Sequence, residues 1–143
     1  MKKFVVVAAA LVALLAAVSA IGSSSKAYTA KLTAGQEVPK PTGAPKNASG
    51  EFTATLTGTT LKYTLTYTHL SGKPFAAHIH LGAKGVAGNV LVAICSSTAN
   101  CKSPIHGTQK VSATVIKAMN AGKTYVNIHT NKNQGGEIRG QIG

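Results

Sequence analysis

The stretch Ala76-Ala77-His78-Ile79-His80-Leu81-Gly82 alternates apolar and polar side chains. Successive side chains of an extended strand point to opposite faces. The stretch therefore predicts a β-strand with both histidines on one face and its aliphatic side chains on the other. A fold built around this strand must bury the aliphatic face and gather other polar groups around the imidazoles.

Two later stretches alternate in the same way and are the predicted neighbours: Tyr125-Val126-Asn127-Ile128-His129-Thr130 and Gly136-Glu137-Ile138-Arg139-Gly140-Gln141-Ile142. Matching their aliphatic faces in a hairpin fixes the register, because a one-residue slip would send one set of side chains to water. The predicted cross-strand pairs are His129 with Glu137, Asn127 with Arg139, and Tyr125 with Gln141.

The histidines His78, His80 and His129 support two hypotheses. Three imidazoles from neighbouring strands form a ligand set that copper or zinc accepts. Copper/zinc superoxide dismutase uses a similar His-x-His on a strand, and this analogy extends the metal hypothesis to dismutase-like chemistry. The alternative is a structural polar cluster formed with Tyr125, Asn127, Glu137, Arg139 and Gln141. His69 and His106 lie near predicted turns and are expected to be exposed.

The N-terminus predicts export. Residues 1–20 combine two lysines, an apolar run and a small-residue cleavage site ending at Ala20, which is typical of a secretory signal peptide. Residues 21–27 are expected to be a flexible leader and residues 28–143 a single domain. The apolar run is shorter than a spanning helix requires, so no membrane span is expected after cleavage. The predicted location is outside the cell, in the periplasm or in the cell envelope.

The chain is strongly basic, with 15 Lys and Arg against 3 Asp and Glu, a net charge of +12. Removal of Lys2 and Lys3 with the signal peptide leaves 13 basic and 3 acidic residues, or +10. This excess fits contact with an acidic envelope polymer. The lysines are scattered and do not alternate with aromatic residues, so a nucleic-acid partner is not expected.

The two cysteines, Cys95 and Cys101, are separated by five residues. In an oxidising compartment such a close pair predicts a disulfide that closes a small loop. A metal-binding pair is the alternative, but no second cysteine pair accompanies it.

The remaining segments predict strands and turns. Residues 28–34, 51–57, 61–67 and 89–95 are expected as strands, 58–60 as a hairpin turn, 35–50 and 103–107 as loops, and 112–120 as a short helix with Ser112 as its N-cap and Gly122 as its stop. About seven short strands in this length favour an all-β, Greek-key-like sandwich of two sheets with one short helix.

The order of the motifs resembles the CHRD domain, named after chordin, over residues 28–143. The matching segments are Leu32-Thr33-Ala34-Gly35-Gln36-Glu37-Val38-Pro39, the His-x-His stretch, Gly88-Asn89-Val90, residues 121–130 and residues 136–142. The resemblance implies a secreted β-sandwich of immunoglobulin-like or superoxide-dismutase-like appearance. Growth-factor antagonism is not expected, because the chain has one such domain and none of chordin's cysteine-rich modules.

The sequence favours a non-catalytic role. Beyond the predicted signal peptide the chain has no Asp and three Glu, at positions 37, 51 and 137, which disfavours a paired-carboxylate mechanism. The sequence also contains no Gly-x-Ser-x-Gly motif. The leading hypothesis is a secreted CHRD-type binding or structural module with an unknown extracellular ligand. A small copper or zinc protein is the alternative, and self-association through exposed strand edges is a third hypothesis.

Overall fold

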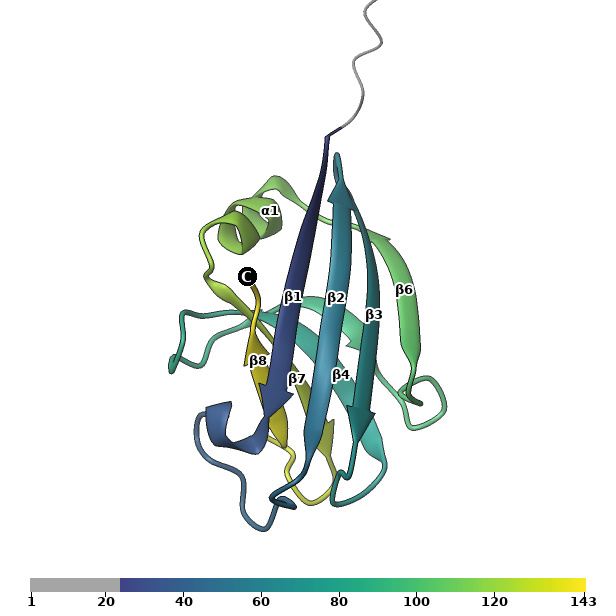
Figure 1. The fold of residues 1–143 in the computed structure, drawn as a ribbon, viewed down its shortest axis with the longest axis vertical. Coiled ribbons are helices and arrows are strands. Elements are labelled where there is room, and N and C mark those ends of the chain that lie inside the picture. Colours follow the sequence, from purple (N-terminus) through teal and green to yellow (C-terminus); the bar gives the residue numbers. More distant parts are fainter. Residues whose placement is uncertain (1–23) are drawn as a thin grey trace, which may run out of the picture.

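A computed structural model describes residues 24–143, and the predicted signal peptide lies outside this range. Within it, eight antiparallel strands form one sheet in the order β5-β4-β7-β8-β1-β2-β3-β6 (Figure 1). The strands are β1 (Ser25–Thr33), β2 (Ser49–Thr57), β3 (Thr60–Thr68), β4 (Pro74–Leu81), β5 (Val90–Cys95), β6 (Ile105–Lys110), β7 (Thr124–Thr130) and β8 (Ile138–Gln141). The helices are α1 (Ala113–Asn120) and a short 3-10 helix (Ala34–Gln36). Both are too short to cross a membrane.

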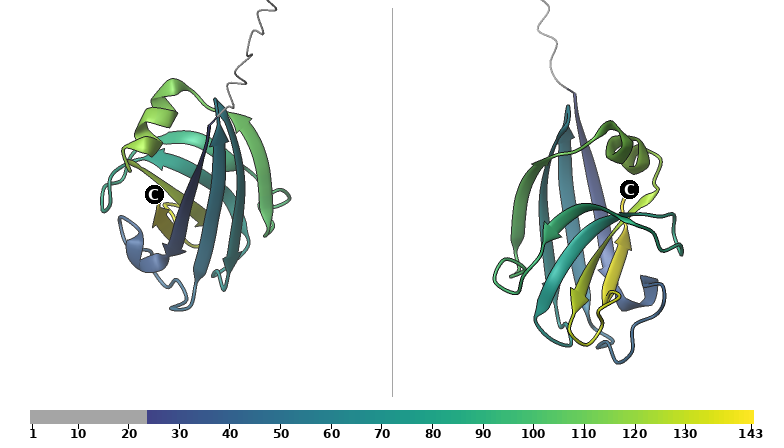
Figure 2. Two further views of the ribbon diagram at one scale, coloured as in Figure 1. Left: turned by 45° about the horizontal axis from the view of Figure 1, so that its top comes forward. Right: turned by 180° about the vertical axis from the view of Figure 1, so that it is seen from behind.

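The all-β class with one short helix is confirmed, whereas the division into two sheets is not clearly seen. The ladder continues from β1 to β8 through the pair Thr33 and Arg139, so the two halves belong to one hydrogen-bonded sheet. This sheet curls until it nearly closes on itself, with β1, β2, β3 and β6 on one side and β4, β7 and β8 on the other (Figures 1 and 2). At the edges, Gln109 on β6 donates a hydrogen bond to the Ala93 carbonyl on β5 (2.7 Å).

The core fills the space inside the curled sheet. Each strand contributes the residues of its inward face, because alternate side chains point to opposite faces. The inner set includes Phe52, Leu61, Leu65, Ala77, Ile79, Val126, Ile128, Ile138 and Ile142, each at most 1% exposed. Ala77 and Ile79 of the His-x-His stretch therefore face the interior with the aliphatic residues of its two predicted neighbours, as alternation predicts. Leu81, at the end of β4, is the exception and is 42% exposed.

Two local predictions are confirmed. Strands β2 and β3 form a hairpin across Gly58 and Thr59, and Gly58 has a φ of 59°, which glycine adopts without steric cost. Helix α1 begins after Ser112, whose hydroxyl accepts a hydrogen bond from the Val115 N–H (3.3 Å). It ends before Gly122, which has a φ of 64°.

Two other predictions are corrected. The predicted flexible leader overlaps β1, where Ser25 to Ala27 pair with β2. The predicted loop at residues 103–107 overlaps the start of β6, an edge strand that pairs with β3. Strand β6 has almost no apolar alternation, because Tyr63 packs over Gly107 in place of a buried side chain.

Closure of the sheet depends on a close approach between β8 and β1 at Gly140. A Cβ atom at this position would lie 2.6 Å from the Lys31 carbonyl oxygen and 3.2 Å from the Ala30 Cβ. Since the oxygen belongs to the backbone, a larger side chain here can be accommodated only if one strand moves.

We therefore expect Gly140→Val to reduce the free energy of unfolding by about 2–3 kcal/mol, as overpacking of a buried site does. Chemical denaturation provides the measurement. The matched control is Gly135→Val, since a Cβ at Gly135 meets no atom within 4 Å. Equal unfolding midpoints for the two variants would contradict the role given to Gly140.

Candidate metal centre

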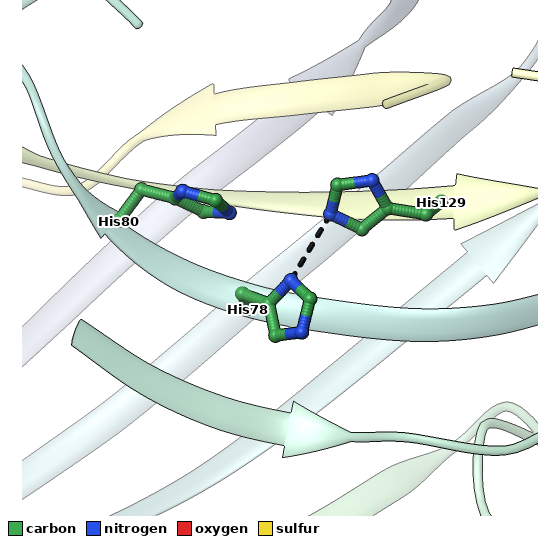
Figure 3. A group of neighbouring side chains, drawn as sticks. All are labelled: His78, His80 and His129. Carbon is green, nitrogen blue, oxygen red and sulfur yellow. Dashed lines mark hydrogen bonds between the residues drawn. The ribbon is translucent and has the colours of Figure 1, made fainter. Parts of the chain in front are cut away.

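The three histidines project from the outer face of β4 and β7. In β4, His78 and His80 point away from the core because Ala77 and Ile79 point into it. His129 on β7 shares this outer face, and the three side chains face one another (Figure 3). Although this face is the outside of the sheet, His80 and His129 are each only 8% exposed.

Loops bury this outer face. The connection between β4 and β5 lies over His80, whose Nδ1 donates a hydrogen bond to the Gly88 carbonyl (2.9 Å). The turn between β7 and β8 lies over His129, whose Nδ1 donates to the Gln134 carbonyl (2.8 Å). Because a carbonyl can only accept, both rings carry their proton on Nδ1.

These two hydrogen bonds determine the tautomers of the whole group. A neutral imidazole protonated on Nδ1 has its lone pair on Nε2. The Nε2 lone pair of His129 faces the Nδ1 of His78 at 3.1 Å, so His78 is the donor in that contact (Figure 3). The two anchored rings thus aim lone pairs, rather than N–H groups, toward the centre of the group.

The lone pair of His80 has no partner. Its Nε2 is buried and makes no hydrogen bond of normal geometry. The nearby Asn127 amide raises the pKa of His80 by less than burial lowers it. One ligand nitrogen from each of the three histidines lies within 4.8 Å of the others. Two nitrogens bound tetrahedrally to zinc lie about 3.3 Å apart, since each Zn–N bond is about 2.0–2.1 Å. Metal binding therefore requires the nitrogens to move closer together. His78 is half-buried and has no hydrogen bond to the backbone, so its ring can rotate toward the other two.

The environment keeps the imidazoles neutral. Burial, and to a smaller extent the neighbouring His129 and His80, lower the pKa of His78 to about 4. Burial also lowers the pKa of His80 and of His129, and the Gly88 and Gln134 carbonyls oppose these shifts only in part. Neutral imidazole is the form that binds a metal ion.

A stack of aromatic and cationic groups supports the centre. The Tyr125 ring lies parallel to the His80 ring, with centroids 4.9 Å apart. The guanidinium of Arg139 lies over the Tyr125 ring, 3.4 Å from its centroid. Arg139 in turn donates through Nη2 to the Ala83 and Val86 carbonyls, which fixes the covering loop. The stack orients His80 in the way that outer groups orient metal-binding imidazoles.

The predicted register of β7 and β8 is observed, with Asn127 opposite Arg139 and Tyr125 opposite Gln141. Gln141 donates through its amide nitrogen to the Gly82, Gly122 and Thr124 carbonyls, each at 2.9 Å. These four side chains therefore lie on the predicted polar face beside the histidines.

Glu137 is the exception. Its backbone N–H donates to the Ile128 carbonyl (2.8 Å), in keeping with the register. Its carboxylate, however, accepts hydrogen bonds from Ser71, Thr130 and Asn133, which corrects the predicted contact with His129. Burial alone would raise the pKa of Glu137, but these donors outweigh burial and leave it below its usual range.

Glu37 joins this polar face from the loop after β1. The sequence allowed a salt bridge between Glu37 and Arg139 but did not include Glu37 in the site. It is 3% exposed, and burial raises its pKa to about 7 against the opposing charge of Arg139. Its place in the site was missed because nothing in the local sequence pattern shows that the loop after β1 packs against β8. The roles of the Gly88 and Gln134 carbonyls could not be predicted, because every residue has a backbone carbonyl and the sequence does not show which one a histidine will contact.

The other candidate ligands lie elsewhere. His69 and His106 are exposed, as expected, and His106 contacts Thr64 on the outer face of the opposite side of the sheet (3.0 Å). Cys95 and Cys101 form the predicted disulfide. The metal hypothesis therefore concerns His78, His80 and His129.

Comparison with known proteins places this site in a family. The model of the CHRD domain matches residues 28–142, which is most of the chain. The chain belongs to the CHRD family. No curated protein matches the chain, and no solved structure matches it. The segments that carry the CHRD resemblance include both histidine-bearing strands and the loop that holds Glu37.

The lowered pKa values make stability depend on pH. The unfolded chain binds protons at His78, His80 and His129 near pH 6.5, before the folded protein does. The contribution of His78 to stability is therefore lost as the pH falls from about 6.5 toward 4, and the lowered pKa values of His80 and His129 act in the same direction. Glu37 acts in the opposite direction, because the folded protein protonates it first, near pH 7.

We expect urea unfolding of metal-free protein at several pH values to show these opposite effects of the histidines and of Glu37 on the free energy of unfolding. The His78→Gln variant should lose less stability than wild type between pH 7 and pH 4.5, and Glu37→Gln should lose more. His106→Gln, which changes an exposed histidine, should follow the wild-type dependence. Identical pH dependence in wild type and His78→Gln would show that His78 titrates normally in the folded protein.

Proposed function

We propose that this CHRD domain is a non-catalytic extracellular binding module, and that its ligand is a transition-metal ion held by His78, His80 and His129. Membership of the CHRD family supports the role of an extracellular or structural binding module. The geometry of the three imidazoles supports the identity of the ligand.

The observation that carries the proposal is the unpartnered Nε2 of His80. A buried polar atom without a hydrogen bond costs about 1–3 kcal/mol. This atom is inaccessible to water, yet it faces two other imidazoles within 4.8 Å. A metal ion forms bonds of about 2.0–2.1 Å, shorter than any hydrogen bond, and can therefore occupy a space that water cannot.

The ligand set favours copper or zinc. Imidazole nitrogen suits these ions, whereas magnesium and calcium require several oxygen ligands. The Glu137 carboxylate is hydrogen-bonded to Thr130 and Asn133 and is not a ligand. The three histidines would therefore supply only neutral nitrogen ligands. His80 Nε2 and His129 Nε2 would be two of the ligand atoms, and His78 Nδ1 would be the third once its proton has moved to Nε2.

Export supports the same role. The Cys95–Cys101 disulfide and the predicted signal peptide both favour an oxidising compartment outside the cytoplasm. Proteins in that compartment meet copper and zinc without competition from the thiols that abound in the cytosol. The proposal is restricted to binding and includes no dismutase-like reaction.

The test is metal titration of protein purified without a polyhistidine tag. We expect one equivalent of Cu²⁺ or Zn²⁺ per chain and a raised unfolding temperature, since a ligand at 100 times its Kd stabilises a protein by about 2.7 kcal/mol. His80→Gln and His129→Gln should each weaken binding by at least about 100-fold, because even groups outside the ligand shell contribute 10–100-fold.

The matched control is His106→Gln, which removes an exposed imidazole that contacts Thr64. It should bind metal as wild type does. Absence of stoichiometric metal in wild type, or equal binding by His80→Gln and wild type, would leave a structural polar cluster as the function of the three histidines.

A further inference from the structure

The residue beneath the three imidazoles is Asn127. In the ladder between β4 and β7 it lies directly opposite His78, and along β7 it is two residues from His129. Residues in these positions share one face of a sheet, and directly opposite residues have Cβ atoms about 4.5–5.5 Å apart. The three imidazoles face one another over the same two strands (Figure 3). The Asn127 side chain therefore begins at the floor of the space that they surround.

The amide oxygen of Asn127 has no hydrogen-bond partner. Asn127 is 2% exposed, and its Oδ1 is buried without a donor, as the Nε2 of His80 is. Buried polar atoms are nearly always paired, so two unpartnered atoms on neighbouring side chains of one site require an explanation. The orientation of the amide shows that the two atoms are related.

The amide nitrogen of Asn127 faces Glu37, and the amide oxygen faces His80. A Cβ atom at Gly136 would collide with both Glu37 Oε1 and Asn127 Nδ2, so these two atoms lie side by side. The amide lowers the pKa of Glu37, as a donor beside a carboxylate does. It raises the pKa of His80, as an acceptor beside an imidazole does. The carboxyl group of Glu37 thus holds the amide with its oxygen toward the histidines.

The amide oxygen and His80 Nε2 cannot form a hydrogen bond with each other. The Gly88 carbonyl fixes the proton of the neutral His80 ring on Nδ1, so Nε2 offers only a lone pair. The oxygen of an amide also offers only lone pairs. Turning the amide by half a turn would separate the two acceptors but would place the amide oxygen against the Glu37 carboxylate. A cation bound to both acceptors satisfies them without that turn.

We infer that Asn127 Oδ1 is the fourth ligand of a Cu²⁺ ion at the three-histidine site, and that Glu37 is the positioning residue that orients it. The inference rests on the proposed function and adds the identity of the ion and of the last ligand. Mixed nitrogen and oxygen ligands suit Cu²⁺, and a side-chain amide oxygen serves as a weak ligand in some copper sites. A site with four protein ligands is closed, whereas a catalytic site keeps one position for water or substrate.

The test is titration of untagged protein with Cu²⁺, followed by addition of azide. Azide binds copper where a coordination position is open, and the complex has a charge-transfer absorption band. We expect wild type to bind one equivalent of Cu²⁺ and to show no azide band. Asn127→Ala should bind Cu²⁺ at least about tenfold more weakly and should show the band, because it removes the oxygen ligand and opens its position. A purely structural role of Asn127 would not change the access of azide to the ion.

An exchange of isosteric groups separates ligation from packing. Glu37→Gln alone removes the carboxylate that orients the amide and should weaken Cu²⁺ binding about 10–100-fold. Combining it with Asn127→Asp exchanges the positions of the amide and the carboxylate, so an oxygen again faces His80 and a donor again faces that oxygen. The double variant should bind Cu²⁺ to within about tenfold of wild type and show no azide band. Asn120→Ala is the control, since this amide accepts a hydrogen bond from Tyr28 at a distant place in the fold.

An azide band in wild type, or wild-type behaviour of Asn127→Ala, would overturn the inference and leave the three-histidine site in place. If Asn127→Ala does not fold, the double variant decides, and Cu²⁺ binding no tighter than that of Glu37→Gln alone would overturn the inference. Absence of stoichiometric Cu²⁺ in wild type would also overturn it. Only absence of both Cu²⁺ and Zn²⁺ overturns the proposed function, so the two failures are distinguishable.

Discussion

The burial of β7 on both faces is the constraint on which the structure depends. All seven of its residues are buried, although alternate side chains point in opposite directions. The inward face can be filled with aliphatic groups, as in any core. The outward face carries Tyr125, Asn127 and His129, and burying it forces each polar group to find a partner or pay for desolvation.

The covering loops supply most of those partners. Backbone carbonyls of the loop after β4 accept hydrogen bonds from His80, from Arg139 and from Gln141. The same contacts fix imidazole tautomers, guanidinium position and amide orientation at once. The polar layer is therefore rigid, and the atoms that it leaves without partners point to ligands better than exposed polar groups would.

The buried and the exposed charges of the domain differ in net sign. Glu37, Glu137 and Arg139 are buried, while the lysines of the described residues are all exposed. Glu51 is thus the exposed acidic side chain within residues 24–143, and the surface is more basic than the net charge indicates. This distribution favours encounters between the surface of the domain and anions.

The sequence by itself determined whatever depends on local period and local chemistry. The faces of β4, β7 and β8, the register that pairs Asn127 with Arg139, the cap at Ser112 and the Cys95–Cys101 disulfide all follow from spacing along the chain. Alternation fixes such features because a slip of one residue would exchange buried and exposed side chains.

Only the tertiary structure decided how the sheet closes and what covers it. The junction of β1 with β8 rests on the pair Thr33 and Arg139 and on two backbone hydrogen bonds between Thr29 and Gly143, just after β8. It also needs the absence of a side chain at Gly140, and none of these features produces a periodic signal. Likewise, Glu137 turns to Ser71 and Glu37 reaches Arg139 across distances in sequence that local pattern does not record. The partners of buried polar groups are set by the folding of distant loops, and for that reason they could not be predicted from the strands alone.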